Sequence, residues 1–141
     1  MLEIHNLTKI YDGKVLAVDN VSFEVKEGEF LAVIGLSGSG KSTLLRCINR
    51  LIEPTSGQII WNNTDITSAS QNEMRNVRRK IGMVFQHFNL VSRSKVITNV
   101  LSGRLGYINP ALSLINKFPQ TDIEMALKQL DIGMNLLIIV K

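Results

Sequence analysis

The residues best suited to chemistry lie between Gly35 and Ser42, which read Gly-Leu-Ser-Gly-Ser-Gly-Lys-Ser. This stretch matches the pattern Gly-x-x-x-x-Gly-Lys-[Ser/Thr]. Its glycines let the backbone turn so that several N–H groups point at one place, which suits an anion. Lys41 adds a positive charge, and the Ser42 hydroxyl can bind a magnesium ion. The spacing therefore predicts a site for the phosphates of a nucleoside triphosphate.

Two elements must hold such a loop. Residues 29–34 are apolar and include a β-branched pair, which predicts a buried strand before the loop. Residues 43–52 place apolar side chains on one helical face, and a helix that begins there directs the positive end of its dipole at the anion. A flexible Gly/Ser-rich loop is the alternative interpretation, and both flanks argue against it.

The rest of the chain predicts an α/β fold. Asp12-Gly13 indicates a hairpin turn between two strands, so an antiparallel β unit precedes the loop. Pro54-Thr55-Ser56-Gly57 marks a break after the first helix. The expected strands are 2–11, 17–25, 29–34, 58–61 and 81–85, and the expected further helices are 71–80, 96–105 and 122–130.

Composition bounds the class of protein. The chain has 141 residues, 45% of them apolar, which fits one globular domain or part of one. No apolar stretch approaches the roughly 18 residues that span a bilayer, and polar residues such as Glu3 and His5 interrupt any signal peptide. The lone Cys47 excludes an internal disulfide, fits a reducing compartment, and is best interpreted as a small apolar core residue.

The charge balance argues against a nucleic-acid partner. The net charge is only +4, and the densest basic cluster, at residues 75–80, has no interleaved aromatic residues. We therefore interpret this cluster as a solvated helix face and expect no nucleic acid among the partners.

Several of these segments together resemble the ATP-binding subunits of ABC transporters. The resemblance rests on Tyr11, the loop at 35–42, the break at 54–57 and the sequence Val84-Phe85-Gln86. It implies a P-loop NTPase domain of the ABC type that binds ATP and Mg²⁺. It further implies that Tyr11 stacks on adenine and that Gln86 reaches the magnesium ion and the water near the terminal phosphate. The alternative for Tyr11 is packing beside its own hairpin. The implied site residues are Tyr11, Gly35, Leu36, Ser37, Gly38, Ser39, Gly40, Lys41, Ser42, Thr43 and Gln86.

Within this family the chain is most similar to the ATPases of phosphonate importers. Residues 44–51, 85–91 and 99–106 carry that likeness, which runs from Met1 to about Asp131. Amino-acid importer ATPases share part of the 85–90 stretch, so an amino-acid importer is the alternative. The resemblance implies a membrane permease and a solute-binding protein as partners, a homodimer of ATP-binding subunits, and a location at the cytoplasmic face of the membrane.

The chain departs from the family after Asp131. The family's signature Leu-Ser-Gly-Gly-Gln, its acidic strand and its later catalytic histidine are absent, and neither His5 nor His87 matches that histidine. We therefore expect the N-terminal part of one ABC-type ATP-binding domain, incomplete at its C-terminus. Its expected parts are a β unit at about 1–28, a P-loop core at about 29–90, the start of a helical subdomain at about 91–131 and an atypical tail at 132–141.

These missing motifs leave the activity open. The chain could energise import, bind nucleotide without hydrolysis, or be a non-functional remnant of a broken gene. A small-molecule kinase is disfavoured by the β unit and by Gln86. An incomplete parallel sheet would also expose strand edges and apolar surface, so we expect marginal stability for the isolated chain.

Overall fold

The computed structural model describes residues 1–85, 90–109 and 117–138, with side chains up to residue 131. The chain divides into two compact units, Met1–Ile81 and Gly82–Lys141.

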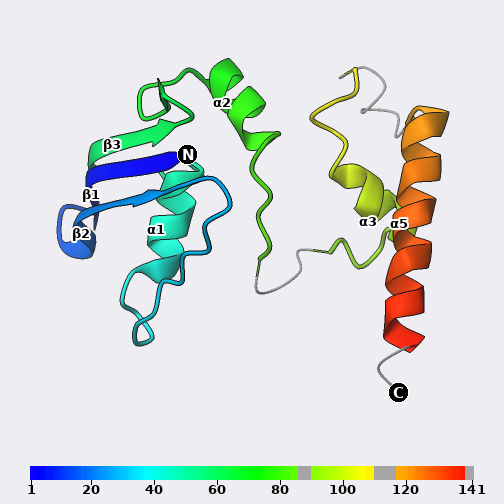
Figure 1. The fold of residues 1–141 in the computed structure, drawn as a ribbon, viewed down its shortest axis with the longest axis horizontal. Helices are drawn as coiled ribbons and strands as arrows, with labels where there is room; N and C mark the ends of the chain where they lie inside the picture. Colours follow the sequence, from blue (N-terminus) through cyan, green and yellow to red (C-terminus); the bar gives the residue numbers. More distant parts are fainter. Residues whose placement is uncertain (86–89, 110–116, 139–141) are drawn as a thin grey trace. The chain divides into compact units, whose positions relative to one another are not determined.

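A four-stranded antiparallel sheet forms the frame of the first unit (Figure 1). The spatial order is β2-β1-β3-β4, so β1 pairs with both β2 and β3. The predicted β unit before the loop is confirmed, and the predicted strand at 58–61 joins the same sheet. The strands are β1 (Leu2–Tyr11), β2 (Val15–Val25), β3 (Ser56–Trp61) and β4 (Thr64–Asp65).

The predicted hairpin turn between β1 and β2 is confirmed. Asp12 and Gly13 have positive φ values of 48° and 65°, a conformation that Gly and Asp adopt more readily than most residues. The Lys14 N–H closes the turn by donating to the Tyr11 carbonyl oxygen at 3.0 Å. The turn residues therefore account for the position at which the chain reverses.

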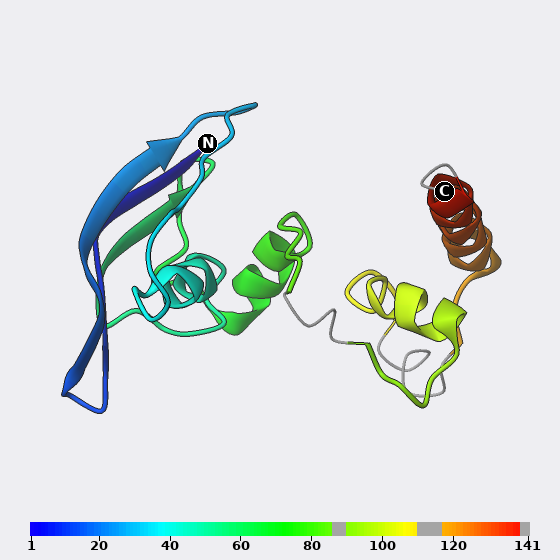
Figure 2. The same ribbon diagram turned by 90° about the horizontal axis from the view of Figure 1, so that it is seen from below.

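Helix α1 (Lys41–Ile48) covers one face of this sheet (Figure 2). It contributes Leu44 and Cys47 to the core, where Cys47 is completely buried. Helix α2 (Gln71–Arg78) begins with a capping box, in which the Ser70 side chain accepts from the Glu73 N–H and the Glu73 carboxylate accepts from the Ser70 N–H. The buried core of the unit is Ile4, Leu7, Val18, Leu44, Cys47, Ile59, Ile66 and Met74.

Two predicted strands are wrong. Residues 29–34 and 81–85 form no strand, although their composition is that of buried strands. Phe30, Ile34 and Val84 are 91%, 92% and 93% exposed. A strand needs a neighbour to pair its backbone N–H and C=O groups, and the described residues provide none for either segment. The apolar pattern indicates that these segments can form strands, but a strand forms only where a neighbouring strand is present to pair with it.

The second unit contains helices α3 (Val96–Ser102) and α5 (Gln120–Ile138). Leu101 and Ala126 are buried between them, and Arg104 Nε binds Asp122 Oδ1 at 2.9 Å. Helix α3 ends three residues before the predicted 105, and α5 extends well beyond the predicted 130. In the part of the chain that the structure describes, no helix has the length and apolar character needed to cross a membrane.

Candidate functional site

The loop at 35–42 leads directly into α1. Gly38 and Gly40 adopt φ values of 83° and 84°, and Gly40 is the N-cap of the helix. The Leu44 N–H donates to the Gly40 carbonyl oxygen at 2.8 Å, which closes the first helical turn. The unpaired N–H groups of that turn and the positive end of the helix dipole therefore lie at the loop, as an anion site requires.

Gly40 is also the point where the loop touches the sheet. A Cβ atom at this position would lie 1.9 Å from the Ala17 carbonyl oxygen on β2. Atoms cannot approach so closely, so only glycine fits between the helix N-terminus and the strand. This contact fixes the distance between the loop and β2.

Lys41 extends back across the loop. Its ammonium group donates to the carbonyl oxygens of Gly35 at 2.8 Å and Leu36 at 2.6 Å, and lies 3.2 Å from Ser39 Oγ. These three oxygens hold the charge over the loop rather than in bulk solvent. An anion in the loop would therefore meet a positive charge that is already in place.

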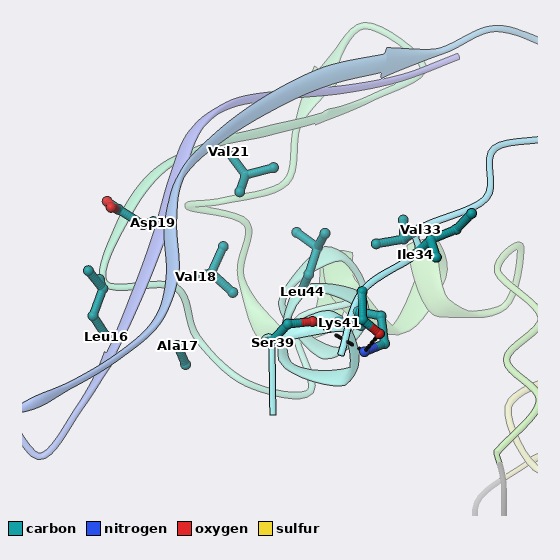
Figure 3. A pocket seen from close by; sticks show the side chains of 12 residues that line it. Leu16, Ala17, Val18, Asp19, Val21, Val33, Ile34, Ser39, Lys41 and Leu44 are labelled. Carbon is teal, nitrogen blue, oxygen red and sulfur yellow. Dashed lines mark hydrogen bonds between the residues drawn. The ribbon is translucent and has the colours of Figure 1, made fainter. Parts of the chain in front are cut away.

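A cavity of about 450 Å³ opens between the loop and β2 (Figure 3). Its loop side includes Ser39 and Lys41, whereas Val18 and Val21 project into it from β2 beside Leu44. One side thus offers charge and hydrogen bonds, and the other offers apolar surface. Such a cavity suits a ligand with an anionic end and an apolar ring. The complete lining is Leu16, Ala17, Val18, Asp19, Val21, Val33, Ile34, Gly35, Ser39, Gly40, Lys41 and Leu44.

The remaining predicted site residues lie around this loop, with two exceptions. Leu36, Ser37 and Ser42 are exposed, and Thr43 is half-buried in the first turn of α1. Tyr11 lies at the end of β1 and does not line the cavity. Its ring centroid is 5.1 Å from Lys9 Nζ, within reach of a cation–π contact. Stacking of Tyr11 on a base stays a prediction. Gln86 and His87 lie outside the described residues.

Sequence reasoning missed the β2 side of the cavity. The alternation of apolar residues along 17–25 puts Val21, Phe23 and Val25 on one face and Val18 on the other. The pairing register of β1 and β2 shifts between Val18 and Val21, and this signal therefore does not find Val18. The close approach of the Ala17 carbonyl to Gly40 has no such signal, because a backbone oxygen is present at every residue.

Cys47 lies behind the loop on α1 and takes no part in it. Burial raises the pKa of its thiol above the usual value, so the thiol stays protonated and unreactive at neutral pH. The interpretation of Cys47 as a small apolar core residue is confirmed.

A family model described as "ABC transporter" matches residues 18–137. This match begins in β2, includes the loop and α1, and ends one residue before the end of α5.

Curated relatives with high identity carry related names. The chain is 50% identical over 131 residues to "Phosphonates import ATP-binding protein PhnC 1" of Halalkalibacterium halodurans, which covers 93% of this chain and 51% of that protein. It is 53% identical over 131 residues to "Phosphonates import ATP-binding protein PhnC 2" of a Synechococcus species, covering 93% of this chain and 49% of the relative. The chain thus spans about half the length of the curated relatives it matches.

Solved structures support the same fold. The dimeric structure of MJ0796, a bacterial ABC transporter cassette, aligns with a TM-score of 0.77 at 35% identity, covering 91% of this chain and 55% of that one. A nucleotide-free ATP-binding cassette from an ABC transporter aligns with a TM-score of 0.73 at 31% identity, covering 93% of this chain and 53% of the other.

Proposed function

Because the chain belongs to the ABC transporter family, we propose that its loop at 35–42 binds the phosphates of ATP. The predicted P-loop NTPase fold of the ABC type is established by the family match and by the solved cassettes. ATP is the ligand whose two ends fit the cavity, with a triphosphate for the loop and a base and ribose for the apolar wall.

One observation carries this proposal: the Lys41 ammonium lies over a glycine loop at the N-terminus of α1 and faces a cavity. Its present partners are two carbonyl oxygens and one hydroxyl, all neutral. Phosphate oxygens carry full negative charge and form stronger, charge-assisted hydrogen bonds. We expect Lys41 to exchange its loop partners for the β and γ phosphates.

Magnesium is part of this proposal. A hydroxyl oxygen is a ligand that Mg²⁺ accepts, and the exposed Ser42 side chain in the first turn of α1 is placed to provide one. Bound there, the ion would neutralise charge between the phosphates. Thr43 would support the phosphates from the same turn, Tyr11 would stack on adenine, and Gln86 would sense the terminal phosphate.

For the whole protein we propose the ATP-binding subunit of a phosphonate importer. The names of the relatives support a phosphonate or related oxyanion over an amino acid as the solute. The partners would be a membrane permease, a solute-binding protein and a second ATP-binding subunit, at the cytoplasmic face of the membrane. Since the chain spans about half of these relatives, hydrolysis is proposed for the whole protein and nucleotide binding for the chain itself.

Replacing Lys41 with alanine tests the proposal. We expect the Lys41→Ala chain to lose at least about tenfold in MgATP affinity by calorimetry, because one charge-assisted contact is worth about 1.5–3 kcal/mol. Lys14→Ala, in the β1–β2 turn, removes the same charge outside the cavity and serves as the matched control. Equal MgATP affinity in the Lys41→Ala and wild-type chains would show that the loop at 35–42 does not bind the phosphates.

A further inference from the structure

The β1–β2 hairpin that forms the apolar wall of the cavity is not regular. Its pairing register shifts at three places, between Ile4 and Leu7, between Leu7 and Lys9, and between Lys9 and Ile10. At the first shift β1 carries the extra residue, and at the next two β2 carries it. Extra residues of this kind are β-bulges, which bend a strand and are common beside functional sites.

Two asparagines connect the first two bulges by a side-chain hydrogen bond. Asn6 and Asn20 are the left-handed residues, with φ values of 49° and 47°. The Asn6 N–H donates to Ser22 Oγ at 2.8 Å, and the Asn20 N–H donates to Thr8 Oγ1 at 3.1 Å. Between them, Asn6 Nδ2 donates to Asn20 Oδ1 at 2.8 Å. At each bulge the backbone N–H of the left-handed asparagine thus donates to a hydroxyl on the opposite strand. One side-chain hydrogen bond links the two bulges.

The bulges change which side chains face the core. Residues three apart on a regular strand point to opposite faces of the sheet. Here Ile4 and Leu7 are both buried, at 1% and 0% exposure. Val18 and Val21 likewise both point toward Leu44 on α1 (Figure 3). The extra residues are what allow both members of each pair to share one face.

The same irregularity places the cavity wall against the loop. The hairpin curves strongly along its length (Figure 2). The third shift adds Ala17 to β2, and the Ala17 carbonyl is the group that meets Gly40. The cavity wall at residues 16–19 therefore contains the third bulge and adjoins the second, at residues 19–20, whereas the loop at 35–42 belongs to a different segment.

We propose that Asn6 and Asn20 are positioning residues for the nucleotide. Their hydrogen bond sets how the apolar wall lies relative to the loop, and so sets affinity for the base and ribose end of ATP without altering affinity for the phosphates. This inference rests on the proposed function, because it assumes that ATP occupies the cavity.

Aspartate substitutions separate the hydrogen bond from the side-chain shape. In Asn20→Asp the Asn6 amide still donates, now to a carboxylate. In Asn6→Asp a rotation of the Asn20 amide lets its Nδ2 donate to the new carboxylate, so the bond persists in each single variant. In the double variant no donor remains and two carboxylates face each other. Aspartate also tolerates the left-handed conformation, so neither change strains the backbone. The comparison is therefore a double-mutant cycle centred on one hydrogen bond.

Each variant of the 141-residue chain is titrated with MgATP and, separately, with magnesium tripolyphosphate, which has phosphates but no base. We expect the double variant to bind ATP at least about fivefold more weakly, with tripolyphosphate affinity within about twofold of wild type. Each single variant is expected to retain ATP affinity within about twofold, which is the rescue by the conservative change. A double variant that binds ATP as wild type does, or that loses both ligands equally, overturns the inference.

Two further variants secure the test. If circular dichroism shows that the double variant does not fold, Asn6→Gly replaces it, because glycine keeps the left-handed conformation and removes the side-chain bond. The same selective loss of ATP affinity is expected, and unchanged ATP affinity overturns the inference. Asn63→Asp, at a φ of 62° in the turn between β3 and β4, controls for the substitution itself. Failure of the wild-type chain to bind ATP would instead overturn the proposed function.

Discussion

Among the single residues of the loop, Gly40 has the least freedom to change. Gly40→Ala adds left-handed strain and a Cβ atom 1.9 Å from the Ala17 carbonyl oxygen. We expect it to lower the free energy of unfolding by about 3 kcal/mol or more and to weaken ATP binding. Thermal or urea unfolding measures the first effect and calorimetry the second.

Gly13→Ala is the matched control for this substitution. Gly13 has a similar positive φ of 65°, but a Cβ atom there would meet nothing within 4 Å. Only the left-handed strain remains, at a cost of about 1–2 kcal/mol. Equal destabilisation by the two alanines would show that the contact between the loop and β2 does not constrain Gly40.

Asp65 links stability to pH. Hydrogen bonds from the Gln58 amide and from Thr67 lower the pKa of its carboxyl group. A carboxyl whose pKa is lowered by folding stabilises the native state above its unfolded pKa, and the gain is lost as pH falls through the folded pKa. Asp65→Asn should therefore destabilise the chain at neutral pH and reduce its loss of stability on acidification.

Urea unfolding at several pH values measures this effect. Asp12→Asn, in the β1–β2 turn, removes one carboxylate from another part of the same sheet and is the control. An Asp65→Asn chain with the same acid dependence as wild type would contradict the role assigned to these hydrogen bonds.

Among the elements, Arg78 joins α2 to the C-terminal end of α1. Arg78 on α2 donates from Nε to the Asn49 carbonyl oxygen at 3.0 Å and from Nη2 to that of Arg50. These are carbonyls at the end of α1, where partners within the helix are lacking. Arg78→Met should lower the free energy of unfolding by about 1–3 kcal/mol.

Arg75→Met provides the comparison for Arg78. Arg75 lies on the same helix and is exposed, and its guanidinium is 3.5 Å from Asn72 Oδ1. We expect this variant to stay within about 0.5 kcal/mol of wild type in urea unfolding. If Arg75→Met lowers the free energy of unfolding as much as Arg78→Met does, the hydrogen bonds from Arg78 to the carbonyls at the end of α1 do not account for the loss.

The elements also show how far sequence reasoning reached. The hairpin at Asp12-Gly13, helices α1 and α2 and the glycine loop were predictable, because each depends on residues close together in the chain. Residues 29–34 and 81–85 were predicted as strands and are not, because strand formation depends on a partner elsewhere. The Asn6–Asn20 bulges escaped prediction because period-two alternation hides an inserted residue.

For the whole molecule, the apolar segments at 29–34 and 81–85 decide behaviour in solution. Phe30, Ile34, Leu36 and Val84 are each at least 85% exposed. Such surface binds hydrophobic dyes and favours association. We expect the isolated chain to bind the dye ANS and to unfold at low denaturant concentration. A cooperative, high-temperature melt of a monomer without dye binding would contradict this expectation.

A control at this scale is a double variant that changes only the exposed surface. Phe30→Ser with Val84→Ser removes two of the most exposed apolar side chains and none from the core. ANS fluorescence should fall while the circular dichroism spectrum stays unchanged. Unchanged fluorescence would assign the dye binding to another part of the chain.

Binding of the ATP phosphates by the loop at 35–42 is the function that we propose for this chain. The most direct measurement is the ¹H–¹⁵N NMR spectrum of the chain with and without MgATP. We expect shifts concentrated at the amides of Gly35 to Thr43 and at the β2 residues that line the cavity. Unchanged loop amides at saturating MgATP, or shifts confined to residues outside the cavity, would contradict it.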